Sequence, residues 1–358
     1  MGRARTSAHV YDVLASAVRG VPQSSDRVAH AHRAAFGIWD RALTLEACGP
    51  WVDRARRGNA ALAAAVTPAD AALRVQGEVA VRQGLAAYAQ LTEIAAVAGR
   101  IGVRVLALKG AARLLDGEAP GRRLLSDIDL LTASPRDATA LFDALRRGGD
   151  YTVDGAVTPG RHRPMLVRAG GLPVEIHERL SDGGSSIDAR VWADATPVSL
   201  GGPTLDIPSA TLRVMHTLQH ALVVHRTLRY RLRDVIDVTT VWAARGVDQD
   251  VVRRWVSHEP YAAAAGTLLA AAGATPYAAD ADRAWSRVRR VAVARLAVPA
   301  RADVRAPDDP LVYVAGQLAE GSPSVWAGLA WRALSRPRHA VTIIEGFVAR
   351  AIGRGRIE

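Results

Sequence analysis

Three acidic residues, Asp127, Asp129 and Glu175, have the types and surroundings that could bind a divalent cation. The two aspartates lie in the apolar segment 124–131, which is typical of a strand, and side chains two residues apart on a strand point to the same face. Glu175 lies in a second short apolar segment, and a neighbouring strand would bring it to the pair. Magnesium takes one or two protein carboxylates together with phosphate oxygens, so this set predicts a metal-dependent phosphate site.

The pattern Asp-x-Asp occurs at 127/129, 248/250 and 280/282, so the pattern alone is weak. Only the first pair is flanked by the apolar residues of a strand. Asp248 and Asp280 lie in Ala- and Gly-rich stretches that resemble helix starts, and we interpret them as N-terminal caps or solvated turns.

A second group of candidates precedes the acidic pair. Residues 103–108 predict a strand that ends at Lys109 and Gly110, followed by a helix to residue 115. Glycine allows a phosphate to approach the backbone, and the N–H groups of a helix start attract anions. We expect Lys109 and Arg123 to contact phosphate. Lys109 could instead be a solvated residue at the strand end, and Arg123 could instead pair with Asp127.

His177 follows Glu175 by two residues and therefore shares its face. It could orient that carboxylate, contact the substrate or make a structural hydrogen bond. Ser126, next to Asp127, joins the phosphate-binding candidates. The full prediction comprises catalytic and metal-binding residues (Asp127, Asp129, Glu175) and residues that bind the phosphate-bearing cofactor (Lys109, Gly110, Arg123, Ser126, His177).

Three blocks in this order resemble the uncharacterised bacterial nucleotidyltransferases of the polymerase-beta-like superfamily. They are Leu-Ala-Leu-Lys-Gly at 106–110, Arg to Asp-Ile-Asp-Leu-Leu at 123–131, and Glu-Ile-His-Glu-Arg-Leu at 175–180. The resemblance spans roughly residues 70 to 240. It departs at Ala111, where the superfamily usually has a serine hydroxyl, and at Glu178, where the related sequences commonly have an aromatic residue.

The resemblance implies a metal-dependent nucleotidyltransferase that moves a nucleoside monophosphate, AMP from ATP, to a hydroxyl and releases pyrophosphate. Mg²⁺ or Mn²⁺ held by Asp127 and Asp129 would neutralise the phosphates, and Glu175 would be the general base or a second metal ligand. Two alternatives stay open. One is a non-catalytic interaction protein with a vestigial site, and the other is a toxin-like nucleotidyltransferase that acts on tRNA or protein.

Composition favours a small-molecule acceptor. The net charge of +11 comes almost entirely from arginines scattered from 54–57 through 226–233 to 350–356, with no series of exposed aromatic residues, so nucleic-acid binding is not favoured. The single cysteine, Cys48, suits a reducing compartment. Residues 1–20 do not resemble a signal peptide and no stretch is long enough to cross a bilayer, so we expect a cytoplasmic protein without a transmembrane segment, of unknown oligomeric state.

The order of the predicted elements indicates an α+β protein. We expect a helical cap at 1–102 and a nucleotidyltransferase core at 103–207, in which a mixed sheet carries helices on one face. A helical domain that closes over the nucleotide or acceptor would follow at 208–298, and a linker with two amphipathic helices, 325–334 and 339–352, would occupy 299–358. Within the third part, Asp234 either serves this closure or pairs with Arg231 or Arg233. We interpret the histidines His216, His220 and His225 as core and surface residues.

Overall fold

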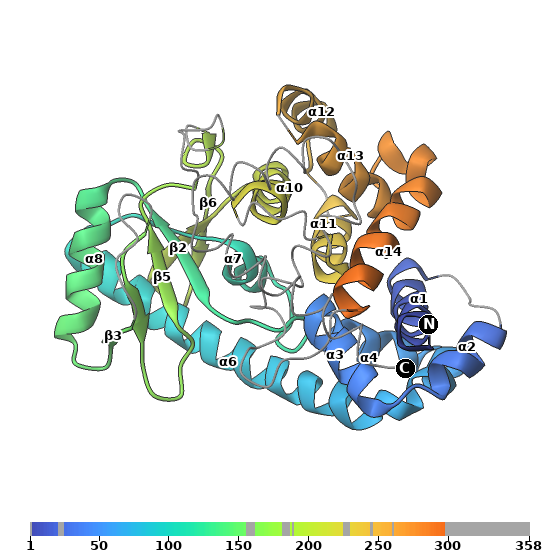
Figure 1. The fold of residues 1–358 in the computed structure, drawn as a ribbon. Coiled ribbons are helices and arrows are strands. Elements are labelled where there is room, and N and C mark those ends of the chain that lie inside the picture. Colours follow the sequence, from blue (N-terminus) through green and yellow to red (C-terminus); the bar gives the residue numbers. More distant parts are fainter. Residues whose placement is uncertain are drawn as a thin grey trace, which may run out of the picture.

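The structure is a computed structural model that describes residues 2–20, 25–154, 162–180, 187, 190–224, 230–243, 246–259 and 261–297. The linker and the amphipathic helices expected at 299–358 lie outside these residues, as does His225. Figure 1 shows a sheet at one end of the molecule and a group of helices at the other.

The sheet has seven strands in the order β3-β4-β5-β2-β1-β7-β6. β2 pairs in parallel with β5, as does β1 with β7, whereas the pairs β1–β2, β3–β4, β4–β5 and β6–β7 are antiparallel. The predicted α+β class with a mixed sheet is therefore confirmed. The strands are β1 Val105–Ala107, β2 Ile128–Thr132, β3 Thr152–Asp154, β4 Met165–Val167, β5 Val174–His177, β6 Thr196–Ser199 and β7 Thr204–Ile207.

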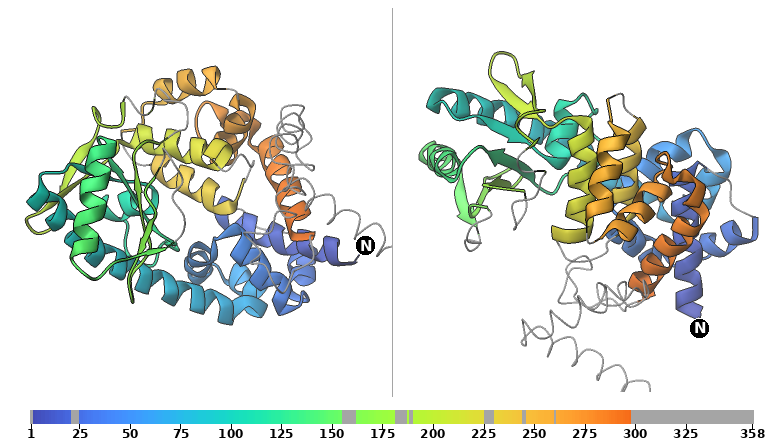
Figure 2. Two further views of the ribbon diagram at one scale, coloured as in Figure 1. Left: turned by 60° about the vertical axis from the view of Figure 1, so that its left-hand side comes forward. Right: turned by 90° about the horizontal axis from the view of Figure 1, so that it is seen from above.

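Helices α6 (Asp70–Ile101) and α8 (Pro135–Arg147) cover one face of the sheet (Figures 1 and 2). Leu130 of β2 packs in one apolar cluster with Ile94 of α6 and Leu141 of α8. Because side chains alternate along a strand, Asp129 lies on the opposite face. Helix packing on one face thus leaves the polar residues of β2 free to form a site on the other.

The ends of several helices follow the local signals in the sequence. Ser134 accepts a hydrogen bond from the backbone N–H of Asp137 and caps α8, and Ser209 caps α10 (Ala210–Gln219) in the same way. Asp248 caps α12 (Gln249–His258), which confirms that this Asp-x-Asp pair begins a helix. α10 is followed directly by the π-helix His220–Val224.

The remaining helices share a second apolar core. Leu14, Trp39, Val235, Leu268 and Val288 belong to this one cluster, so the N-terminal helices pack against those that follow the sheet. The domain boundaries expected at residues 102 and 207 stay a prediction. These helices are α1 Gly2–Arg19, α2 Ser25–His32, α3 Phe36–Glu46, α4 Gly49–Arg57, α5 Ala60–Val66, α11 Leu232–Ala243, α13 Ala262–Ala271 and α14 Ala281–Ala297. Helix α7, Lys109–Leu115, lies between β1 and β2 in the chain and packs in the first cluster, and the 3-10 turns are Thr67–Ala69 and Tyr277–Asp280.

Within the described residues, the helices are too short or too polar to cross a bilayer.

A buried ion pair joins three helices of this second core. Glu46 of α3 is fully buried, and its carboxylate accepts hydrogen bonds from Arg295 of α14 at 2.7 Å and from the backbone N–H of Leu232 at the start of α11 at 2.8 Å. Burial raises the pKa of Glu46, and the charge of Arg295 opposes that rise. Removing one partner of such a pair leaves the other charge buried without compensation.

We expect Glu46→Ala to lower the free energy of unfolding by about 3–5 kcal/mol, measured by urea denaturation. The matched control is Asp282→Asn, which breaks the 3.1 Å ion pair with Arg19 at the exposed end of α14. The Asp282 side chain is 96% exposed, so the control should unfold at nearly the wild-type urea concentration. Equal effects of the two substitutions would contradict the structural role of Glu46.

Candidate functional site

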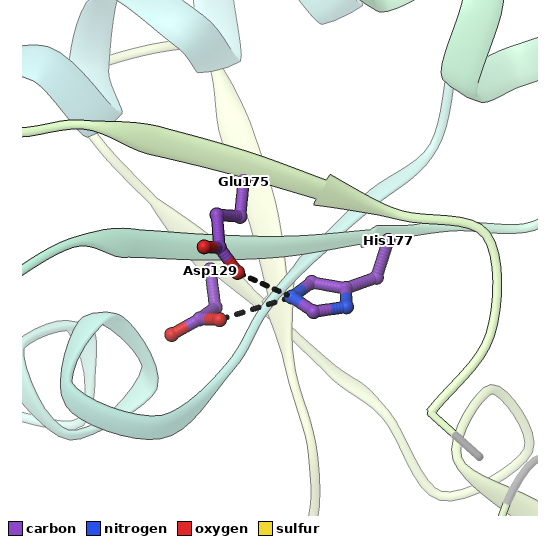
Figure 3. Close-up of side chains that lie close together, drawn as sticks. All are labelled: Asp129, Glu175 and His177. Carbon is purple, nitrogen blue, oxygen red and sulfur yellow. Dashed lines mark hydrogen bonds and ion pairs between the residues drawn. The ribbon is translucent and has the colours of Figure 1, made fainter. Parts of the chain in front are cut away.

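The parallel pairing of β2 with β5 brings three predicted residues together. Asp129 lies directly opposite Glu175 and Leu131 lies opposite His177, so the side chains at 129, 175 and 177 share one face of the sheet. Figure 3 shows Asp129 and Glu175 both pointing toward the imidazole of His177. We expected a neighbouring strand to bring Glu175 to the pair Asp127 and Asp129, and the register shows this for Asp129. His177 shares the face of Glu175, as its spacing predicted.

Asp129 is the most connected residue of the site. It is only 2% exposed, and its Oδ1 atom lies 2.7 Å from Lys109 Nζ and 3.0 Å from His177 Nε2. His177 Nε2 also lies 3.5 Å from Glu175 Oε2. Burial alone would raise the pKa of Asp129, but the charge of Lys109 and the hydrogen bond with His177 outweigh burial and hold this pKa well below its usual value. Asp129 is therefore ionised at neutral pH.

Asp127 directly precedes β2 and is half-buried. Burial and the negative charges of Asp129 and Glu175 raise the pKa of Asp127, whereas Lys109 and a hydrogen bond with Ser126 lower it. Asp127 therefore lies within electrostatic reach of both acidic neighbours.

Two carboxylates and one imidazole form the group that could hold a metal ion. Within the described part of the chain, one oxygen of Asp129, one of Glu175 and one nitrogen of His177 lie within 4.8 Å of one another, and Asp127 is outside this group. Donors bound side by side on one divalent ion, at about 2.0–2.2 Å from it, lie about 3 Å apart, close to the separations around His177 Nε2. The three residues fit such an ion. His177 is therefore the third member of the group, whereas the sequence predicted Asp127 as the third metal ligand. The role of Asp127 as a metal ligand stays a prediction.

Lys109 reaches Asp129 through an unusual backbone conformation. Its φ of 46° lies in the left-handed region, which a non-glycine residue rarely adopts, and it is the first residue of α7. The Lys109 side chain is 20% exposed, and its ammonium forms an ion pair with the carboxylate of Asp129. Lys109 is therefore not a solvated strand end, and its contact with phosphate stays a prediction.

Position 110 requires glycine because a side chain would not fit there, and not because of its backbone conformation. A Cβ atom at this position would lie 2.2 Å from Nη1 of Arg123 and 2.3 Å from Cδ2 of Leu125. The missing side chain lets the guanidinium of Arg123 pass over the start of α7. Arg123 then donates to Asp237 on α11 at 2.9 Å, so its carboxylate partner is Asp237 and not Asp127.

Asp237 was not apparent from the sequence, because its partners Arg113 and Arg123 precede it by more than one hundred residues. Asp234, by contrast, pairs with Arg231 at 3.0 Å, which confirms the ion pair considered from the sequence.

Comparisons with known proteins point to one family. A sequence model for a family described as uncharacterised nucleotidyltransferases matches residues 55–296. Among solved structures, the chain is similar to the crystal structure of an antigenic nucleotidyltransferase-like protein from Paracoccidioides brasiliensis, with 17% identity over 50% of this chain and 92% of that chain, and a TM-score of 0.36. No curated protein matches the sequence.

We expect Gly110→Ala to lower the free energy of unfolding by about 1–3 kcal/mol, because the added methyl group overlaps Arg123 and Leu125. The control is Gly99→Ala in α6, where an added Cβ meets nothing within 4 Å and alanine is the better helix former. Thermal denaturation of both variants checks this, and a Gly110→Ala protein as stable as Gly99→Ala would refute the packing argument.

We expect Asp129→Asn to weaken Mn²⁺ binding about tenfold or more, because this residue contributes a charged oxygen to the group of three and orders His177. Titration of Mn²⁺ followed by electron paramagnetic resonance measures the free ion. Asp250→Asn is the control, since Asp250 belongs to another Asp-x-Asp pair and its side chain is 65% exposed. Wild-type affinity in the Asp129 variant would show that the ion binds elsewhere.

Proposed function

The chain belongs to the uncharacterised nucleotidyltransferase family, and on that premise we propose that it transfers a nucleoside monophosphate from an NTP to a hydroxyl group of a small-molecule acceptor. The expected donor is ATP, the transferred group AMP and the other product pyrophosphate. The observation that carries the proposal is the convergence of Asp129, Glu175, His177 and Lys109 on one face of the sheet.

Asp129, Glu175 and His177 are the residues that would hold the divalent ion, with Asp127 beside them. A Mg²⁺ or Mn²⁺ ion bound there would neutralise charge on the phosphate oxygens of the nucleotide. Asp129 suits this role because its carboxylate is ionised and fixed by two neighbours. The imidazole of His177 makes Mn²⁺ a good candidate, because nitrogen ligands suit transition metals better than magnesium.

Glu175 is the candidate general base. Its side chain is 29% exposed, whereas the Asp129 side chain is 2% exposed and already accepts two contacts on one oxygen. An acceptor could therefore reach Glu175 and not Asp129. In the proposed step the acceptor oxygen forms a bond to the α-phosphorus while its proton passes to Glu175. The bond from the α-phosphorus to the bridging oxygen breaks, and pyrophosphate leaves with that oxygen and the electron pair.

The nucleotide contacts proposed from the sequence are consistent with the positions of their residues. Lys109 neighbours the acidic group and remains partly exposed, so its ammonium could contact both Asp129 and a phosphate oxygen. Ser126 is exposed beside Asp127, and Gly110 and Arg123 lie at the start of α7. A small acceptor is proposed over tRNA or protein because the arginines of the sequence are scattered.

We expect Asp127→Asn and Asp129→Asn each to reduce nucleotide transfer about a hundredfold or more while the protein stays folded, because each removes a charge next to the reacting phosphate. Mass spectrometry of products, after incubation with the four NTPs, Mg²⁺ and a cell extract, measures the transfer. Asp250→Asn is the charge-matched control and should retain wild-type turnover. Unchanged nucleotide transfer by both site variants would overturn the proposal. If the wild-type protein binds no MgATP at millimolar concentration, the alternative of a non-catalytic interaction protein is favoured.

A further inference from the structure

Helix α6 exposes more large apolar side chains than the other described elements. Figure 1 shows this helix along the lower edge of the molecule, from the helical group to the sheet. One side of α6 packs in the two apolar cores, through Leu73 in one and Leu91 in the other. Of the seven large apolar side chains that are exposed among the described residues, five belong to α6: Val75, Val81, Leu85, Tyr88 and Ile101. Apolar side chains that gather on one exposed surface mark an interaction site.

The exposed residues of α6 follow the spacing of a coiled coil. Alternating steps of four and three residues separate six exposed residues, which we call the α6 seam: Ala71, Val75, Glu78, Arg82, Leu85 and Ala89. At about 100° per residue these positions form one stripe, on the side of the helix opposite to the buried Ala80, Ala87 and Leu91. Because this spacing keeps the stripe facing one direction, a second helix can pack along its whole length.

The two charged residues in the middle of the seam have no ion-pair partner within the described ranges. Glu78 and Arg82 are both exposed and lie four residues apart, a spacing at which opposite charges can pair within one helix. They do not pair with each other, whereas Arg74 of the same helix lies 3.6 Å from Asp70. Glu78 and Arg82 are therefore available to a second molecule.

The seam is complementary to itself when two copies of the helix run antiparallel. With the two-fold axis midway between residues 78 and 82, Glu78 of each helix faces Arg82 of the other. One ion pair thus forms twice, as a two-fold interface requires. A parallel pair would instead place Glu78 against Glu78 and Arg82 against Arg82, and such like charges repel. The order of the charges therefore favours the antiparallel arrangement.

The same antiparallel register also pairs the apolar residues of the seam. Val75 of each helix faces Leu85 of the other, and Ala71 faces Ala89 at either end. Val75 is 57% and Leu85 59% exposed in the single chain. Pairing removes both side chains from water, which stabilises the dimer. Each residue of the seam thereby meets a residue of matching character.

We propose that the protein forms a two-fold homodimer through antiparallel pairing of the α6 seams of two copies. The seam extends over about 27 Å of helix, so the interface is small for a specific one, and we expect a reversible dimer with a Kd of about micromolar size. α6 covers the face of the sheet opposite to Asp129, so pairing leaves the acidic site of each copy open. The inference does not rest on the proposed nucleotide transfer.

Sedimentation equilibrium of the full chain, over concentrations below and above the expected Kd, tests this assignment. The wild-type mass should rise from that of a monomer to that of a dimer. We expect Leu85→Glu to raise the dimer Kd about tenfold or more, because pairing would bury the new carboxylate against Val75. Val153→Glu is the control, since Val153 is 42% exposed on the edge strand β3, and its Kd should equal that of wild type. Melting temperatures at a concentration where all variants are monomeric should agree, because Leu85 is exposed.

Charge reversal tests the register of the pairing. Glu78→Arg and Arg82→Glu each bring like charges together and should each raise the dimer Kd about tenfold or more. The double variant restores opposite charges and should return the Kd to within about threefold of wild type. Three results would overturn the inference: a wild-type protein that stays monomeric at the highest concentration, a dimer that Leu85→Glu leaves intact, or a double variant that dimerises no better than either single one.

Discussion

The contact between Lys109 and Asp129 is the interaction on which the site depends. Asp129 is buried next to two other carboxyl groups, and burial among like charges favours the protonated acid. The ammonium of Lys109, with His177, keeps Asp129 ionised. This requires β1 to lie beside β2, and it requires a left-handed backbone at Lys109. A left-handed backbone is costly for a residue other than glycine, and here it accompanies the contact that keeps Asp129 ionised.

The helices outside the sheet contribute to the same arrangement. α11 carries Arg233 and Asp237, and its first residue, Leu232, is held by Glu46, which in turn binds Arg295 of α14. The buried ion pair of the helical core thus holds the start of the helix that carries Asp237, the partner of Arg123. Helices from before and after the sheet therefore contribute to the framework of the site.

Patterns within a few residues predicted part of the site, whereas contacts between residues far apart in the sequence could not be predicted. Alternation along a strand was sufficient to place Glu175 and His177 on one face, and the cap at Asp248 follows from hydrogen-bonding rules within a few residues. Alternation could not show that Asp127 precedes the strand and that His177 lies closer to Asp129 and Glu175. The pairing of Arg123 with Asp237, and the space that Gly110 leaves for Arg123, depend on how α11 packs against α7, which no local pattern encodes.

X-ray diffraction from crystals grown with Mn²⁺ and a non-hydrolysable ATP analogue tests the central claim most directly, because the anomalous signal of manganese locates the ion independently of the protein. The account predicts an anomalous peak at coordination distance from Asp129, Glu175 and His177. A peak away from the acidic group, or a nucleotide bound away from it, would contradict the account.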